Sequence, residues 1–235
     1  SREMLQANPV LAAMKKAITG KVLADLAKLA RDDAATYDTL WSQYGRVLKE
    51  GLYEDFERRD ELLKLARFRS THAEGWHSLD AYVGRMKPDQ AAIYYLAADA
   101  TAPASPQLEG FTARGLEVLL LSDPVDDFWA PAVQDYEGKP LRSITQADAA
   151  ELGAAPDMAQ AEAASDADMA RLVAVMKGVL GDAIKDVRAS GRLTTSAVCL
   201  VAGEGSADLR LARMPKAHDR LHMTSDRILE LNPRH

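Results

Sequence analysis

Apolar side chains in the first third of the chain recur at steps of three and four residues, the spacing that places them on one face of an α-helix. Such stripes run through residues 9–31, 33–51 and 55–68. Asn8 can cap the first helix, and Pro9 suits its first position. The inward positions are Leu11, Met14, Ile18, Val22, Leu26 and Leu29, then Tyr37, Leu40, Trp41, Tyr44, Val47 and Leu48, then Leu62, Leu65 and Ala66. Three helices of this kind bury their stripes only on one another or on a neighbouring domain.

The hydrophobic period changes after residue 90. Two short apolar runs at 92–96 and 116–121 lack helical spacing and are typical of buried strands. Between them lies a segment at 107–114 with helical character, ended by Gly115. The order strand, helix, strand predicts a parallel pair joined by a crossover connection. A small α/β layer is therefore expected to follow the helices.

Residues 151–168 consist mainly of Ala, Asp, Glu and Gly, with almost no bulky apolar side chain to offset the entropy of ordering them. A linker is predicted there. A helical stripe follows at 169–180, and candidate strands at 184–188 and 196–201. The predicted fold class is α/β with α+β character: a coil of three helices, a small α-β-α layered subdomain, and the start of a second α/β unit. The expected domain ranges are 1–87, 88–150, 151–168 for the linker, and 169–235.

The composition and net charge exclude some classes of binding partner. The 235 residues carry 47% apolar and 27% charged side chains with a net charge of −6, and no cluster of Lys and Arg. Nucleic acids and anionic membranes are held largely by such clusters, so neither is an expected partner. No apolar stretch is long enough to cross a bilayer, and the first residues of the sequence lack the basic-then-apolar pattern of a signal peptide. The single cysteine, Cys199, allows no intrachain disulfide or zinc knuckle, its apolar run disfavours the thiolate, and a reducing cytoplasm fits.

Three acidic residues, Asp123, Asp126 and Asp127, follow the second predicted strand. The C-terminal end of a parallel strand is a common ligand site, and carboxylates can hold magnesium there. Acidic residues in a first helical turn also complement the helix dipole, and Pro124 suits a first helical position. Because no glycine-rich phosphate loop or nearby Lys completes a site, the structural interpretation is favoured.

His218 and His222 are spaced as a two-histidine metal pair would be on a helix, but nothing supplies a third ligand. No metal site is predicted. The sequence contains no GxSxG, Walker or dinucleotide-binding motif. The chain by itself is therefore expected to carry no cofactor and no self-contained active site.

Phe128 and Trp129 are adjacent aromatic residues directly after the acidic turn. Adjacent positions on a helix face different ways, so one of the two side chains is a candidate for an exposed partner surface. The alternative is that both pack against the sheet and its neighbour.

A series of residue blocks in conserved order resembles the 90-kDa heat-shock chaperone family. Residues 1–6 read SREMLQ, and the agreement continues in register along nearly the whole chain. The short acidic linker resembles that of the bacterial form. The further blocks are 45–51 with 54–55, 67–71, Ser78-Leu79 with Tyr82, 85–87, 93–95, 115–119, 123–126, 138–140 and 230–233.

This resemblance implies a cytoplasmic, homodimeric, ATP-driven chaperone for unfolded or partly folded client proteins. In the family, an N-terminal domain binds ATP and Mg²⁺, a middle domain completes hydrolysis, and a C-terminal domain dimerises. Arg2 and Gln6 match the residues that reach the γ-phosphate, which makes them the candidate catalytic residues acting on the chain's own N-terminal ATPase domain.

The resemblance also implies a client-binding surface. Its candidate residues are Phe128, Trp129, Leu211 and Met214. Pro215 departs from the family pattern and would shorten or kink the helix that carries the last two. Because residue 1 already lies in what reads as an internal motif, the chain is expected to be a fragment, from the later middle domain into the C-terminal domain. The alternative function is an interaction scaffold without nucleotide chemistry.

Overall fold

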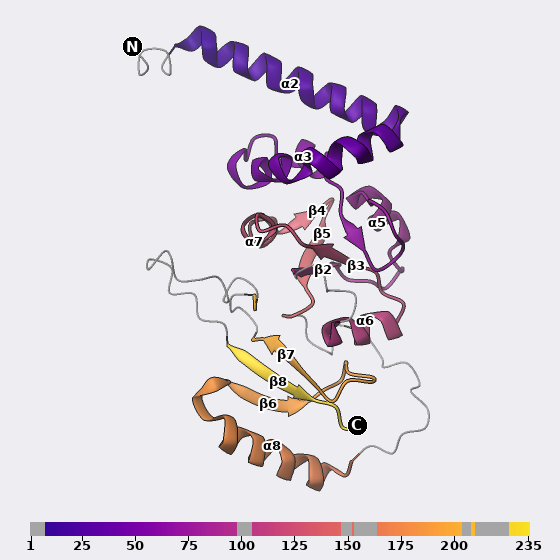
Figure 1. The fold of residues 1–235 in the computed structure, drawn as a ribbon, viewed down its shortest axis with the longest axis vertical. Coiled ribbons are helices and arrows are strands. Elements are labelled where there is room, and N and C mark those ends of the chain that lie inside the picture. The colour runs from indigo at the N-terminus through magenta and orange to yellow at the C-terminus, as the bar shows by residue number, and fades with distance from the viewer. Residues whose placement is uncertain (1–7, 98–104, 147–151, 153–163, 204–207, 210–225) are drawn as a thin grey trace. The chain divides into compact units, whose positions relative to one another are not determined.

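The computed structural model describes residues 8–97, 105–146, 152, 164–203, 208–209 and 226–235 (Figure 1). By contacts between residues, the chain divides into two compact units. The helical unit comprises Ser1–Arg67 with Ser78–Asp80, and the sheet unit comprises Phe68–His77 with Ala81–His235.

The described residues of the helical unit form the helices α2 (Pro9–Asp32), α3 (Ala34–Glu54) and α4 (Arg59–Leu65). The first two begin at side-chain caps. The Asn8 carboxamide oxygen accepts the Val10 N–H at 2.9 Å, and the Asp33 carboxylate accepts the Thr36 N–H at 3.1 Å. Each cap satisfies a backbone donor that a helix start leaves open. The prediction of two long helices that meet near residue 33 is confirmed.

The third predicted helix, 55–68, is wrong at both ends because α4 is much shorter. Helix α3 ends at Asp55, which is its C-cap residue. The Asp55 carboxylate accepts hydrogen bonds from the backbone N–H of Arg58 at 3.2 Å and from the Arg58 guanidinium at 2.9 Å. Such local side-chain bonds compete with helix formation. At the other end Ala66 is extended, and Phe68 forms a β-bridge with His77.

Tyr37 lies at the centre of the helical unit. Its hydroxyl donates to the Leu65 carbonyl at 2.7 Å, its ring stacks on Trp41 with 6.2 Å between centroids, and the Arg67 guanidinium lies 4.7 Å above it. Burial raises the pKa of its hydroxyl to about 12, so Tyr37 stays a neutral donor. The stripe of α2 is only partly inward: its buried residue is Leu23, and the exposed large apolar side chains of the first two helices are Val10, Leu11, Met14, Ile18, Val22, Tyr44, Val47 and Tyr53.

The sheet unit begins with a five-stranded sheet in the order β1-β3-β2-β5-β4. Its strands are β1 (Arg69–Ser70), β2 (Ile93–Ala97), β3 (Val118–Leu121), β4 (Asp135–Tyr136) and β5 (Lys139–Ser143). The central strand β2 is parallel to both β3 and β5, which confirms the predicted parallel pair. The short strand β1 was not predicted, because it has only two residues and pairs with a strand about fifty positions later.

Short helices connect these strands: α5 (Leu79–Arg85), η2 (Pro106–Leu108), α6 (Glu109–Ala113), α7 (Asp126–Trp129) and η3 (Ala130–Ala132). The Phe111 ring of α6 packs edge-on against Tyr94 of β2, with 4.9 Å between centroids. Leu108, Val118 and Ile144 belong to the same buried cluster. The segment predicted as helix at 107–114 thus covers the sheet.

The second sheet has the order β6-β8-β7 and lies beside α8 (Figure 1). Its elements are α8 (Asp166–Leu180), η5 (Gly181–Ala183), β6 (Asp186–Ala189), β7 (Val198–Ala202) and β8 (Arg227–Leu231). β8 pairs parallel with β6 and antiparallel with β7. α8 contributes Met169, Val173, Met176 and Leu180 to the core under the sheet. The predicted α/β fold class is confirmed.

Candidate functional site

Four of the six predicted site residues, Arg2, Gln6, Leu211 and Met214, lie outside the described residues, as do the two histidines of the possible metal pair. Their roles stay predictions. The other two, Phe128 and Trp129, lie on α7, directly after the strand β3.

The two adjacent aromatic side chains point to different environments. Phe128 is 46% exposed, whereas Trp129 is 0% exposed. The Trp129 ring lies 5.7 Å from Phe68 by centroids, and its indole N–H donates to the Asp126 carboxylate at 2.7 Å. The structure therefore revises the predicted surface: Phe128 lies on it, and Trp129 lies in the core, because a four-residue helix turns successive side chains to different sides.

Asp126 explains the acidic turn. Its side chain is fully buried, and besides the Trp129 indole it accepts the backbone N–H of Asp123 at 2.9 Å. Both bonds fix the first turn of α7, which supports the structural interpretation of the acidic residues. In the described part of the chain, no group of three or more His, Cys, Asp or Glu side chains is placed to hold a metal ion.

Other exposed apolar residues lie close to Phe128 in the sequence. Pro124 is exposed in the turn before α7, and Pro131 and Ala132 are exposed in η3, which directly follows α7. We call these four residues the α7 surface. Its base is rigid, because the buried Trp129 and Asp126 hold the same turn. It can offer an apolar contact on a fixed support.

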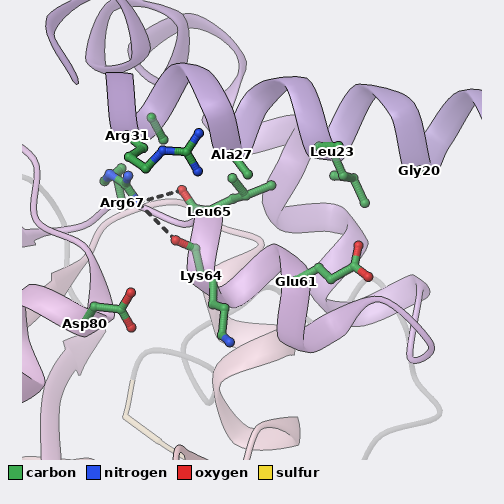
Figure 2. A pocket seen from close by; sticks show the side chains of 11 residues that line it. Gly20, Leu23, Ala27, Arg31, Glu61, Lys64, Leu65, Arg67 and Asp80 are labelled. Carbon is green, nitrogen blue, oxygen red and sulfur yellow. Dashed lines mark hydrogen bonds between the residues drawn. The ribbon is translucent and has the colours of Figure 1, made fainter. Parts of the chain in front are cut away.

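A pocket of about 590 Å³ lies in the helical unit between α2 and α4 (Figure 2). Small side chains of α2 form one wall, and Figure 2 shows charged side chains along its edge. The Arg67 guanidinium donates to the carbonyls of Lys64 at 3.2 Å and Leu65 at 3.0 Å, so this cation holds the end of α4. The pocket offers apolar contact and no convergent set of catalytic groups. It is lined by Gly20, Leu23, Ala24, Ala27, Ala30, Arg31, Glu61, Lys64, Leu65, Arg67 and Asp80.

Cys199 is buried in β7, and burial raises the pKa of its thiol to about 12. Because the thiolate is the reactive form, we expect almost no reaction with a chromogenic aromatic disulfide at pH 8 over minutes in the folded protein. In denaturing urea the same thiol should react at the rate of a free cysteine. Rapid reaction without denaturant would show that the β7 region opens readily.

Sequence reasoning missed an ionic cluster around the buried side chains of Glu230 and Arg192. The Glu230 carboxylate pairs with the guanidinium groups of Arg188 at 2.7 Å and Arg192 at 2.9 Å and accepts the Ser190 hydroxyl at 2.9 Å. The available signal was a charged residue inside the apolar strand β8. A buried carboxylate in such a run needs charged partners, but the sequence does not say which.

No helix of the described residues combines the length and apolarity needed to span a membrane. The family profile described as Hsp90 protein matches residues 1–235. The chain belongs to the Hsp90 family. Chaperone protein HtpG of Mesorhizobium japonicum is 52% identical over 241 residues, that of Azorhizobium caulinodans 51% over 245, and that of Rhodospirillum rubrum 49% over 245.

Each alignment covers 100% of this Hsp90-family chain and 38 or 39% of the relative, so the chain spans about two fifths of the length of these relatives. Several of its family-like residues hold the fold. The Arg85 guanidinium makes two 2.8 Å bonds to the Glu117 carboxylate, and the Tyr82 hydroxyl donates to the Glu117 carbonyl at 2.7 Å. These contacts join α5 to the residue that precedes β3.

Proposed function

We propose that this chain is part of an ATP-driven chaperone and that its α7 surface contacts unfolded or partly folded client proteins. Membership of the Hsp90 family supports the chaperone function, since the relatives are named as chaperones. The observation that supports the client surface is the exposure of Phe128 beside the buried Trp129. An exposed aromatic on a rigid base suits weak, adaptable contact with many apolar segments.

In this proposal ATP hydrolysis takes place in the N-terminal domain of the full-length protein, with Mg²⁺ bound there. The sequence of this chain contains no phosphate-cradling loop. Arg2 would donate from its forked guanidinium to γ-phosphate oxygens, and Gln6 would orient the attacking water or the loop itself.

Further parts of the proposal concern assembly and location. Leu211 and Met214 would add a second apolar contact for clients. The full-length protein would form a homodimer and work in the cytoplasm, in keeping with a single cysteine that is buried.

Phe128→Ala tests the client surface. We expect it to weaken binding of reduced, carboxymethylated lactalbumin, an unfolded probe, by roughly fivefold, because burying part of one aromatic side chain is worth about 1 kcal/mol. Fluorescence anisotropy with labelled probe measures the dissociation constant.

Phe56→Ala is the matched control, since Phe56 is also an exposed phenylalanine, 69% exposed, in the turn between α3 and α4 of the helical unit. It should leave the dissociation constant unchanged. Equal weakening by both variants would mean that the probe samples any exposed aromatic, and no change in Phe128→Ala would remove the α7 surface from the proposal.

A further inference from the structure

The carboxylate of Glu109 is one of several groups that link the five-stranded sheet to the three-stranded sheet within the sheet unit. Glu109 is the first residue of α6, which covers the first sheet, and its partners Thr194, Thr195 and Ser196 precede β7 of the second. These residues are 85 to 87 positions apart in the sequence. The contact is therefore purely tertiary.

The three partners surround the carboxylate with both backbone and side-chain donors. The backbone N–H groups of Thr194, Thr195 and Ser196 lie 2.7, 2.9 and 3.1 Å from its oxygens. The hydroxyls of Thr194 and Thr195 donate at 3.2 and 3.0 Å, and the Ser196 hydroxyl donates as well. Six donors converge on one anion, and hydrogen bonds to a charged acceptor are the strong ones.

The carboxylate is held in its charged form. Burial acts to raise the pKa of Glu109, but the hydrogen bonds from the Ser196 hydroxyl and the three backbone N–H groups outweigh it and lower the pKa to about 2. The group therefore remains ionised, and its contacts remain intact, throughout the neutral range.

Other hydrogen bonds also link the two sheets close to Glu109. Arg192 is 1% exposed and donates to the Ile144 carbonyl at 2.7 Å, and the Gln107 carboxamide donates to the Leu200 carbonyl at 2.8 Å. A Cβ placed on Gly110 would lie 2.7 Å from the Arg192 Cβ and 2.9 Å from its backbone. The absence of a side chain at 110 thus lets α6 approach the 190–196 loop closely.

We infer that Glu109 is a latch that fixes the 190–196 loop and so makes the two sheets of the sheet unit move as one body. Removing its carboxylate leaves six donors without their acceptor at the joint, while the core of each sheet stays intact. The latch is a positioning device and is independent of the proposed client surface.

Two measurements on Glu109→Ala test the latch. Hydrogen exchange should show the amides of Thr194, Thr195 and Ser196 exchanging about tenfold faster or more, since they lose a charged acceptor. Spin labels on Lys139→Cys in β5 and Arg171→Cys in α8, both exposed positions, report the distance between the two sheets, and its distribution should broaden. The buried Cys199 should remain unlabelled.

Glu117→Ala is the matched control, because it removes a carboxylate that directly precedes β3 of the first sheet and pairs with Arg85 of α5. It should change neither the exchange at 194–196 nor the distance distribution. A Glu109→Ala distribution as narrow as that of the unsubstituted protein would overturn the latch. If Glu109→Ala does not fold, Glu109→Gln can be used instead, because it keeps the shape of the side chain and removes its charge. An increase of less than about threefold in the exchange rates of the 194–196 amides in Glu109→Gln would overturn the latch.

Discussion

Trp129→Ala is expected to lower the free energy of unfolding by about 3–5 kcal/mol, the range for removing a large buried aromatic side chain. Trp129 is fully buried, packs against Phe68, and donates its indole N–H to Asp126. The substitution leaves a cavity beneath α7 and takes one hydrogen-bond donor from a buried carboxylate. Urea unfolding followed by circular dichroism measures the change.

Phe128→Ala is the neighbouring control for this prediction. Because Phe128 is about half exposed, its removal should lower the free energy of unfolding by only about 1 kcal/mol or less. Trp129→Phe keeps an aromatic ring and loses the indole donor, so it should fall between the two. Equal stability of the two alanine variants would contradict the assignment of Trp129 to the core.

Arg2→Ala in the full-length protein is expected to lower ATP turnover by about tenfold or more while ATP affinity stays almost unchanged. In the proposed function, Arg2 contacts the γ-phosphate, and most nucleotide contacts belong to the N-terminal domain. Arg2→Lys should recover little activity, because an ammonium keeps the charge and loses the forked donor geometry.

Steady-state ATPase assays paired with nucleotide titrations separate turnover from binding for the parent protein and both variants. Unchanged turnover in Arg2→Ala would remove Arg2 from the catalytic assignment. A loss explained wholly by weaker ATP binding would do the same. Gln6→Ala offers a comparison within the same motif, with a smaller loss expected because an amide carries no charge to place near the phosphate.

The helices that begin at caps formed by residues close together in the sequence were predicted correctly. The start of α2 depends on Asn8 and Pro9, and the start of α3 on Asp33 and Thr36, so each signal lies within three residues. The third helix failed because the Asp55 carboxylate captures the N–H of Arg58, a competition that an apolar period does not show. The two-residue strand β1 exists only through its pairing with β3.

The candidate site was predictable only in part. The sequence indicated that Phe128 and Trp129 face different ways, and the position of Phe68, about sixty residues earlier, decides which of them is buried. The exposed part of the α2 stripe shows the same limit: periodicity marks an apolar face, and burial depends on what packs against it.

The sequence by itself determined the Hsp90 family, the long helices α2 and α3, and the parallel pairing of β2 with β3, because caps, hydrophobic periods and ordered motifs are carried by neighbouring residues. Tertiary structure alone decided the burial of Trp129, the pairing of Glu230 with Arg188 and Arg192, and the joint at Glu109. These features depend on groups brought together from as many as 87 positions apart, and the sequence shows only that a buried carboxylate needs partners.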